Sequence, residues 1–483
     1  MTTTFLHGVE TVSLTVGPKK IDEVKTAIIG VIGTAPIHHA SDAADSLNKA
    51  VFIASDREPP TKFGPDLAGY SLLRAIKAAQ DQGAGTIFAI NVFNPAKAEH
   101  RTAVAVATRT ITDGVCTLPH QDLISVTVTT SADAACVEGT DYEVDLVTGI
   151  ITVLEGGNLE GDADCKVAHV RATPAGVVAA DVVGAVTDGV RTGMQAFLDC
   201  ASRFGYGPKT LIAPGFSSTA SVRTALAVLA QKTKLRALVL ADAPLAATRD
   251  DVVEGRGAEG EIDLIVSDPR VVLCYPHLKS FRVATNQTEL EPYSGRAAGV
   301  IAANDRDRGY WVSPSNKPIL GITGTEVALT AAVNDPTCDV NLLNAAGVMT
   351  VFAAYGIAPR TWGNRSSAFP GANDILTFIP CLRTQDVIEE SIELSTLAHL
   401  DGPIGKPLID AVLADVNEFF RVLIGRGAAM PGSRCEYFDE DNSPAELAAG
   451  HLVFTYEYCP PPPAEKLTFK AVVNTNLLAG LGG

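Results

Sequence analysis

The sequence predicts a mixed α/β protein of several domains, and three observations support this fold class. The chain has 483 residues, more than the roughly 250 to 300 at which a single hydrophobic core usually stops growing. Its composition is globular, with 46% hydrophobic and 19% charged residues. Buried-strand patterns alternate with helical patterns over most of the chain, whereas one stretch carries only short β segments. We therefore expect an α/β core, an inserted all-β domain and a C-terminal α+β domain, with extended strand arms at both ends.

The N-terminal region begins with a predicted strand arm that covers residues 1–20. Its apolar residues alternate with threonine and serine, the period-two pattern of a strand that buries one face: Val12, Leu14 and Val16. Gly17 and Pro18 follow directly and are predicted to act as a linker hinge.

The α/β core is expected to be discontinuous, with one part at residues 21–101 and the other at residues 176–374. The first part contains the buried strands "TAIIGVIG" and "AVFIAS", a helix over 67–82 and the strand "TIFAINVF". The second part opens with the helical pattern "GVRTGMQAFLDCASRFG". It continues with "KTLIAPGF", a helix near 219–232, "LRALVLAD" and "EIDLIVSDPRVVLCYP". This alternation predicts strand–helix units.

Two features after the first strand resemble parts of ligand sites. "GVIGTA" at 30–35 is similar to a phosphate-binding glycine loop, but it lacks the full G-x-G-x-x-G and a supporting acid. Tight packing of a strand end is therefore the favoured interpretation. His38 and His39 are adjacent, and neighbouring side chains are expected to point apart, with no third ligand at metal-binding spacing. We expect a surface loop here and no metal site.

Residues 102–175 have the pattern of a small all-β domain inserted into the α/β core. Short β segments are separated there by turn residues: "RTITDG", "LISVTVTT", "DYEVDLVTG", "IITVLEGGN" and "CKVAHVRAT".

Residues 375–463 are predicted to form the C-terminal α+β domain. "TQDVIEESIELSTLAHL" indicates a helix that Thr384 caps at its N-terminus. "PLIDAVLADVNEFFRVLIGRG" predicts a second helix, at 406–426, with a broad apolar stripe, and Gly427 ends it. The opposite face of that helix carries charged residues: Asp410, Asp415, Glu418 and Arg421.

The last predicted element is a strand arm at residues 464–483. Its apolar residues alternate with polar ones such as Asn474: Leu467, Phe469, Ala471 and Val473. Four prolines precede the arm and are expected to form a stiff spacer of about 12 Å that also serves as a hinge: Pro460, Pro461, Pro462 and Pro463. The arm is thereby kept from folding back onto the preceding strand pattern, "HLVFTYEY". It pairs either with another chain or with the N-terminal arm of its own chain.

Charge and motif content argue against several classes of function. A formal charge of −17 without a compensating basic run opposes direct nucleic-acid binding. The longest apolar run, about ten residues, is too short to cross a bilayer, and the N-terminus lacks a secretory signal, so we expect a cytoplasmic chain with no membrane insertion. Nine scattered cysteines indicate reduced, mostly buried thiols. No G-x-S-x-G, H-E-x-x-H or P-loop lysine is present, so no catalytic residue and no cofactor is predicted.

The densest unusual stretch is "AAYGIAPRTWGNRSS" at 353–367, where Trp362 taken alone predicts a core or interface anchor. The stretch resembles the W-G-x-R-[TS] signature of contractile phage tail sheath proteins, a family shared with tailocins and related injection machines. "SGRAAGVIAANDRDRGYWVSPSNKPILGITG" at 294–324 is similar to the family's A-G-x-x-A helix, acid and G-x-W-x-S-P-[AS]-N segment. The matching residues are Ala298, Gly299, Asp305, Gly309, Trp311, Ser313, Pro314, Asn316, Arg360, Trp362, Gly363 and Arg365.

The resemblance extends in the same order over most of the chain. "VKTAIIGVIGTAP", "LLNAAGVMTV" and "FKAVVNTN" are similar to further family segments, whereas residues 102–175 resemble the family's variable insertions. Ser315 stands where alanine is common, which is a mild departure from the pattern.

The resemblance implies a structural subunit and not an enzyme. Family members stack as six-fold rings around an inner tube, exchange terminal strands between neighbours, and contract to drive the tube through the target cell envelope for genome ejection. The implied partners are other copies of the chain, the inner tail tube protein, and baseplate and tail terminator proteins. The implied location is a virion tail that is assembled in the host cytoplasm.

The resemblance also assigns surfaces. The tube contact is expected on the helix at 406–426, and the inserted β domain is expected on the outer surface. The candidate contact residues are Asp410, Asp415, Glu418, Arg421 and Arg426. The alternatives are the sheath of a DNA-free tailocin or other injection system, a non-contractile shell or tube protein, and an uncharacterised α/β enzyme.

Overall fold

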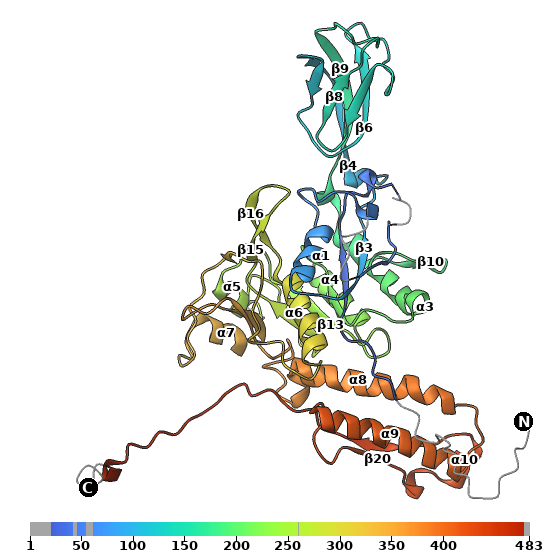
Figure 1. Ribbon diagram of the computed structural model, residues 1–483, viewed down its shortest axis with the longest axis vertical. Coiled ribbons are helices and arrows are strands. Elements are labelled where there is room, and N and C mark those ends of the chain that lie inside the picture. The colour runs from blue at the N-terminus through green and yellow to red at the C-terminus, as the bar shows by residue number, and fades with distance from the viewer. Residues whose placement is uncertain (1–20, 42–45, 55–60, 259, 478–483) are drawn as a thin grey trace, which may run out of the picture. The chain divides into compact units, whose positions relative to one another are not determined.

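The computed structural model describes residues 21–41, 46–54, 61–258 and 260–477, which form two compact units (Figure 1). The larger unit contains Lys25–Arg383 and the chain from Pro462 onward. The smaller unit contains Thr384–Pro461 together with residues 21–24. The predicted fold class, a mixed α/β protein of several domains, is confirmed. The predicted N-terminal strand, with its hinge at Gly17 and Pro18, lies outside the described residues.

An eight-stranded sheet forms the centre of the larger unit, in the order β19-β18-β14-β13-β12-β1-β3-β2. The strands from β18 to β3 are parallel, whereas β19 and β2 run antiparallel to their neighbours at the two edges. Their bounds are β1 Ile28–Gly33, β2 Val51–Ile53, β3 Thr86–Asn91, β12 Thr210–Ile212, β13 Leu238–Asp242, β14 Val271–Cys274, β18 Val348–Phe352 and β19 Arg360–Trp362.

Helices cover both faces of this sheet, which is why its central strands are continuous apolar runs (Figure 1). On one face, Ile29 and Val31 of β1 share a core with α1 (Leu72–Asp81) and α6 (Tyr293–Asp307). On the other face, Ile28 and Ile32 belong to a core that includes residues of α2, α4 and the 3₁₀ helix Gly193–Asp199. The remaining helix bounds are α2 Ala179–Val183, α3 Cys200–Phe204, α4 Ala220–Leu229, α5 Arg249–Glu254 and α7 Asp339–Ala345.

Three predicted elements differ in detail. β2 is an edge strand and not a buried one, so Phe52 is 38% exposed. The helix predicted over 67–82 begins only at Leu72. Gly69 adopts φ +86°, and an α-helix cannot run through a residue in this backbone conformation. The helical pattern at 189–205 forms the end of the β10–β11 hairpin, a 3₁₀ helix and the short α3. Gly193 has φ +55° at the start of that 3₁₀ helix, which prevents a continuous α-helix.

The glycines of "GVIGTA" are explained by packing. A Cβ at Gly30 would lie 2.9 Å from side-chain atoms of Leu211 and Pro208, and one at Gly33 would lie 2.5 Å from Ser71 Oγ. Both glycines therefore allow the strand to approach its neighbours closely. The packing interpretation of this motif is confirmed.

Residues 101–172 fold into two three-stranded antiparallel sheets, β4-β9-β6 and β5-β8-β7. The two sheets bury a shared core that includes Cys116, Val128, Tyr142, Ile151 and Val167. The strand bounds are β4 Arg101–Thr110, β5 Val115–Thr117, β6 Leu123–Thr130, β7 Tyr142–Asp145, β8 Ile150–Val153 and β9 Asp164–Ala172. Two smaller sheets complete the larger unit: β10 Val186–Thr187 with β11 Val190–Arg191, and β16 Gln287–Glu291 with β15 Leu278–Arg282 and β17 Gly324–Thr325.

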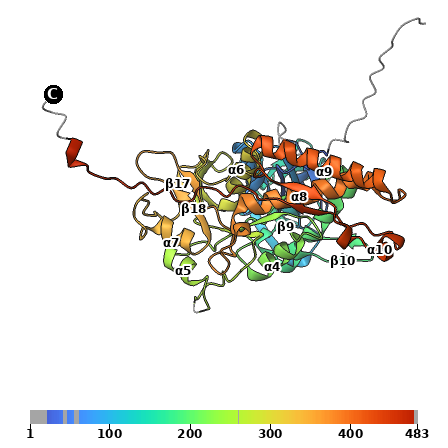
Figure 2. The same cartoon turned by 90° about the horizontal axis from the view of Figure 1, so that it is seen from below.

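The smaller unit is built on two long helices, which run side by side in Figures 1 and 2. They are α8 (Ile379–Thr396), most of which lies in this unit, and α9 (Lys406–Arg426). Beside them lie α10 (Pro444–Ala448) and the paired strands β20 (Arg434–Glu436) and β21 (Thr455–Glu457). Gly427 ends α9 with φ +79°, as predicted.

The prediction that Thr384 caps α8 is wrong. The helix begins five residues earlier, at Ile379, and Thr384 is fully buried inside it. Pro380 stands in the first turn, where the missing N–H of a proline leaves no hydrogen bond unmade, so the sequence allows this earlier start.

Two further observations concern the cysteines and the helices of the described residues. All nine cysteines are free thiols and seven of them are buried, as expected. Among the helices of the described residues, none is both long enough and apolar enough to cross a bilayer.

Candidate functional site: the motif groove and the C-terminal arm

The two segments that carry the sequence motifs lie against each other at β19. Backbone N–H of Asn316 donates to the carbonyl of Thr361 over 2.6 Å, and Thr361 Oγ1 donates to the carbonyl of Pro314 over 2.6 Å. The N–H of Gly363 donates to Ser315 Oγ over 3.0 Å. Segments about fifty positions apart in the sequence thus form one platform.

Two glycines of the motifs are required by close contacts. Gly309 has φ +105°, and a Cβ there would lie 2.4 Å from the Trp311 ring, which stacks edge-on against Tyr310 with centroids 5.0 Å apart. Gly363 has φ +137°, and a Cβ there would lie 2.7 Å from Asn344 Oδ1. Both positions are closed to residues with a side chain.

Arg360, beside the second tryptophan, bonds to Asn316 of the first motif. Trp362 packs against Phe352 with ring centroids 4.6 Å apart, and Arg360 Nη1 donates to the backbone carbonyl and Oδ1 of Asn316, each over 3.3 Å. Burial and the nearby Arg308 and Arg360 guanidinium groups lower the pKa of Lys317.

Arg365, the arginine of the W-G-x-R motif, binds the first residues of the C-terminal arm. Its Nε lies 3.1 Å from both carboxylate oxygens of Glu465, and Nη2 lies 2.9 Å from Oε2. Nη1 donates to Asn373 Oδ1 and Thr377 Oγ1, at 2.8 and 3.1 Å. The guanidinium also lies between the rings of Phe369 and Phe378, at 4.4 and 4.1 Å from their centroids. Because these contacts fix the Arg365 guanidinium, its N–H groups are held in position for the carboxylate of Glu465.

Residues of both motifs and of the start of the arm line a groove of about 460 Å³, which we call the motif groove. Its walls come from both motifs and from the start of the arm: Ser313, Ser315, Asn316, Trp362, Gly363, Asn364, Pro463, Ala464 and Glu465. Ser313 pairs with Asn364, and Ser315 pairs with Gly363, so the hydroxyl groups are already engaged. None of the described residues that line the groove is a histidine or a cysteine. The start of the C-terminal arm forms part of the groove wall.

Beyond Glu465 the C-terminal arm is exposed and forms no strand within the described chain (Figure 1). Phe469 is 89% exposed and Val473 is 91% exposed. The strand before the prolines, β21, pairs with β20, and Pro460 is buried next to it. Pairing with the N-terminal arm falls outside the described residues.

The candidate tube-contact residues on α9 differ in environment. Asp410 is exposed, Glu418 pairs with Arg421, and Arg426 pairs with Glu23. Asp415 was predicted on the exposed face, but it is buried and accepts a hydrogen bond of 3.0 Å from His399 Nε2. Its position between Val412 and Val416 on the apolar stripe accounts for this burial.

The acid of the first motif has a structural role. Asp305, on α6, forms a buried two-point ion pair with Arg383 of α8, whose Nη1 lies 2.6 Å from Asp305 Oδ1. Asn304 beside it donates from Nδ2 to the carbonyl of Val312 over 2.8 Å. Asp305 thus fixes the start of α8, and Asn304 fixes the segment that leads to the motif groove.

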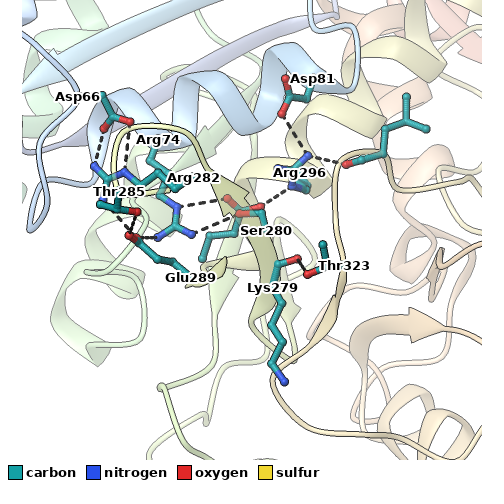
Figure 3. A network of polar contacts seen from close by, with 12 residues as sticks. Asp66, Arg74, Asp81, Lys279, Ser280, Arg282, Thr285, Glu289, Arg296 and Thr323 are labelled. Atoms are coloured by element: carbon teal, nitrogen blue, oxygen red, sulfur yellow. Dashed lines mark hydrogen bonds and ion pairs between the residues drawn. The ribbon is translucent and has the colours of Figure 1, made fainter. Parts of the chain in front are cut away.

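A second polar cluster joins the β15–β16 hairpin to α1 and α6 (Figure 3). Arg282 bonds to Asp66 over 2.5 Å and to Glu289 over 3.2 Å, and Arg74 reaches Glu289 over 3.1 Å. Arg296 pairs with Glu291 and, over 3.4 Å, with Asp81. These opposite charges are paired with one another, which is the pattern of a structural network.

Several residues of the site were missed by sequence reasoning. Glu465, Asn373, Phe369 and Phe378 surround Arg365 but belong to no motif. The one available signal was the position of Glu465 at the start of the arm, two residues after the last of the four prolines.

Comparison with known proteins shows which family these motifs belong to. A family model described as the phage tail sheath protein central domain matches residues 189–367, which include both motifs. Another, the phage tail sheath C-terminal domain, matches residues 372–474, which include the four prolines and most of the arm. A third, for a protein of unknown function, matches residues 94–190. The tail sheath protein of Burkholderia phage BcepMu is 40% identical, with 100% of both chains covered. This chain belongs to the phage tail sheath family.

More distant sheath proteins agree with this assignment. The tail sheath protein of Escherichia phage P2 is 26% identical, with 98% of this chain and 97% of that protein covered. The PVC sheath complex of an extracellular contractile injection system, in its contracted state, has the same fold, with a TM-score of 0.60, 13% identity, and 99% and 100% of the two chains covered. The contracted helical sheath of the anti-feeding prophage matches with a TM-score of 0.56 at 16% identity, covering 98% and 100%. The chain is a structural protein of a contractile tail sheath, so the enzyme alternative is set aside.

Proposed function

We propose that this sheath chain polymerises as stacked six-fold rings around an inner tube and contracts to drive that tube through the target cell envelope for genome ejection. The single observation that carries the proposal is the C-terminal arm, which is anchored at Glu465 and exposes Leu467, Phe469 and Val473. An apolar segment that pairs with no described strand of its own chain is stabilised by adding to a sheet of another subunit. The phage origin of the full-length BcepMu relative supports genome ejection over a DNA-free sheath.

The ends of the chain are proposed to link neighbouring subunits. The residues that exchange are Leu467, Phe469, Ala471, Val473 and Asn474 at the C-terminus, and Val12, Leu14 and Val16 at the N-terminus. Backbone ladder hydrogen bonds supply affinity, and the alternating apolar face supplies specificity. The prolines at 460–463 and Gly17 with Pro18 serve as hinges, so that subunit bodies rotate while the exchanged strands stay paired.

We propose α9 as the tube-facing element, with Asp410, Glu418, Arg421 and Arg426 as contacts. Pairing of Glu418 with Arg421 presents a surface of low net charge, which suits a contact that must release. The domain boundaries follow the sequence proposal: the core at 21–101 and 176–374, the outer β domain at 102–175, and the tube-side domain at 375–463. Baseplate and tail terminator proteins are the proposed partners at the two ends of the sheath, and assembly takes place in the host cytoplasm.

Contraction is proposed to use two alternative packings of the same subunits. Interfaces between rigid bodies switch between discrete arrangements, and the difference in their free energy performs the work without nucleotide hydrolysis.

The test is electron microscopy of the concentrated full-length chain in negative stain. Striated tubes or stacked cogwheel rings are the expected result, and a persistent compact monomer would overturn the proposal. A chain that ends at Glu465 is the matched variant, because it keeps the Arg365 ion pair and lacks the exposed arm. We expect it to stay folded and monomeric. Normal tubes from this variant would refute strand exchange by the C-terminal arm.

A further inference from the structure

A cluster of two histidines and one carboxylate lies at the base of the inserted β sheets. His38 and His39 belong to the 3₁₀ helix Ile37–His39 that follows β1, and Asp122 stands directly before β6. His38 Nε2 lies 2.8 Å from Asp122 Oδ1, and His39 Nε2 lies 3.0 Å from the same oxygen. The two rings lie 4.0 Å apart. The prediction that these histidines point apart is wrong, because both rings turn toward the same oxygen of Asp122.

The cluster is buried and its carboxylate is held in place. The side chains of His38, His39 and Asp122 are 5%, 6% and 19% exposed. Tyr70 donates its hydroxyl to Asp122 Oδ2 over 2.7 Å, and burial together with the Asp122 charge raises the pKa of Tyr70. Burial opposes the charge on Asp122, but the hydrogen bonds from His38, His39 and Tyr70 outweigh it and lower its pKa well below the usual range. Tyr70 therefore orients the carboxylate.

The backbone around Asp122 fixes its position as well. Asp122 adopts φ +58°, its N–H donates to the carbonyl of Val147 over 3.1 Å, and its own carbonyl accepts from Ala172 over 2.9 Å. Asp122 is thus held by its backbone as well as by Tyr70.

Two imidazoles and a carboxylate are the donor set of a divalent transition-metal ion. The three ligand atoms lie within 4.8 Å of one another, and the two nitrogens lie about 3 Å from the oxygen. Ligands at right angles around an ion with bonds of about 2.1 Å are separated by about 3 Å. We propose that His38 Nε2, His39 Nε2 and one oxygen of Asp122 bind a divalent transition-metal ion such as Zn²⁺, with water completing the coordination shell.

Binding of the ion has defined consequences for the ligands. Each imidazole coordinates through the Nε2 lone pair and carries its proton on Nδ1. Tyr70 keeps its hydrogen bond to Asp122 Oδ2 and orients the carboxylate without contacting the ion. Because His38 and Asp122 are 84 positions apart, the ion joins the loop after β1 to the first residues of β6. It therefore stiffens the junction between the α/β core and the inserted sheets.

The experiment uses the untagged full-length chain after removal of metals with a chelator. Co²⁺ is titrated in and followed by its visible absorption, and Zn²⁺ is then added in competition. We expect one Co²⁺ per chain, displaced by Zn²⁺, and loss of binding in His39→Ala and Asp122→Asn. Tyr70→Phe is expected to bind about 10- to 100-fold more weakly. His399→Ala is the matched control, because His399 also bonds a carboxylate over 3.0 Å but lacks a second histidine, and it should bind like wild type.

Folding of each variant is checked by circular dichroism. X-ray absorption of the Zn²⁺-loaded wild-type chain supplies a second measurement that needs no substitution, and it should show imidazole nitrogen and oxygen ligands. The proposal is overturned if the wild-type chain takes up no ion, if uptake survives both His39→Ala and Asp122→Asn, or if the spectrum shows sulfur ligands. In those cases the cluster is a hydrogen-bonded junction only.

Discussion

Strand β1 and the C-terminal arm have similar apolar content but opposite environments. All six residues of β1 are buried, with β12 and β3 paired on its two sides. In the arm, Phe469 and Val473 are almost fully exposed and no described strand pairs with them. What differs is the chain beside each segment. The chain that follows β1 supplies its neighbour β3 through α1, whereas four prolines precede the arm and the Arg365–Glu465 ion pair holds its first residues. An apolar strand pattern therefore predicts that a partner exists, and the connecting segment predicts whether that partner is internal.

The largest effect is expected from removing a core side chain next to β1. Phe88 of β3 is fully buried against both β1 and neighbouring aromatic rings. Phe88→Ala should lower the free energy of unfolding by about 3–5 kcal/mol, because it removes a large apolar contact and leaves a cavity. Denaturant unfolding measures this change. A loss of unfolding free energy below about 1 kcal/mol would contradict the expectation that burial of Phe88 stabilises the sheet around β1.

A smaller effect is expected where the two motif segments meet, next to the motif groove. Gly309→Ala places a Cβ against the Trp311 ring in a left-handed backbone conformation. The variant should be destabilised by about 1–3 kcal/mol. Thermal unfolding with tryptophan fluorescence follows both the stability and the ring environment. Gly257→Ala is a useful control, because its nearest contact is an ordinary 3.4 Å and its φ lies outside the left-handed region.

The anchor of the arm is tested by Arg365→Lys. Lysine keeps the positive charge but loses the fork that holds Glu465, Asn373 and Thr377 together, and it loses the flat stack between Phe369 and Phe378. We expect a stability loss of about 1 kcal/mol and a clear weakening of assembly. Light scattering against protein concentration measures the second quantity. Assembly at the wild-type concentration would mean that the ion pair does not position the arm.

The smallest effect on folding is expected within the arm itself. Phe469→Ser should change the free energy of unfolding by no more than about 0.5 kcal/mol, because the exposed ring makes no core contact in the isolated subunit. Its assembly should nevertheless require a higher protein concentration. Lys470→Ser, on the alternate face, is the matched control and should assemble normally. An equal loss in both variants would indicate that the alternating face carries no specificity.

The elements with continuous apolar runs and good caps were predictable from sequence, whereas contacts between distant segments were not. The strands β1, β3 and β13 and the helix α9 follow their local patterns closely, because burial on both faces or along one stripe leaves a clear period. Boundaries failed where backbone geometry overrode the pattern, as at Thr384 and Gly69.

Side-chain environment was the hardest property to predict. Asp415 was grouped with charged residues of α9, but it lies on the apolar stripe with Val412 and Val416, and it is buried there with His399 as its partner. The meeting of His38 and His39 depends on Asp122, which lies 84 positions after His38. Likewise, Arg365 was recognised as a motif residue, but its contact with Glu465 spans 100 positions. Local periodicity contains no information about such pairs.

Amide hydrogen exchange of residues 466–474 measures most directly whether the C-terminal arm finds its partner in another subunit. In the isolated monomer these amides should exchange at the rate of unfolded chain, because they lack strand partners among the described residues. In the assembled sheath they should become strongly protected, while the amides of β1 are protected in both states. Protection of 466–474 already in the monomer would contradict the account, since it would place the partner strand within the same chain.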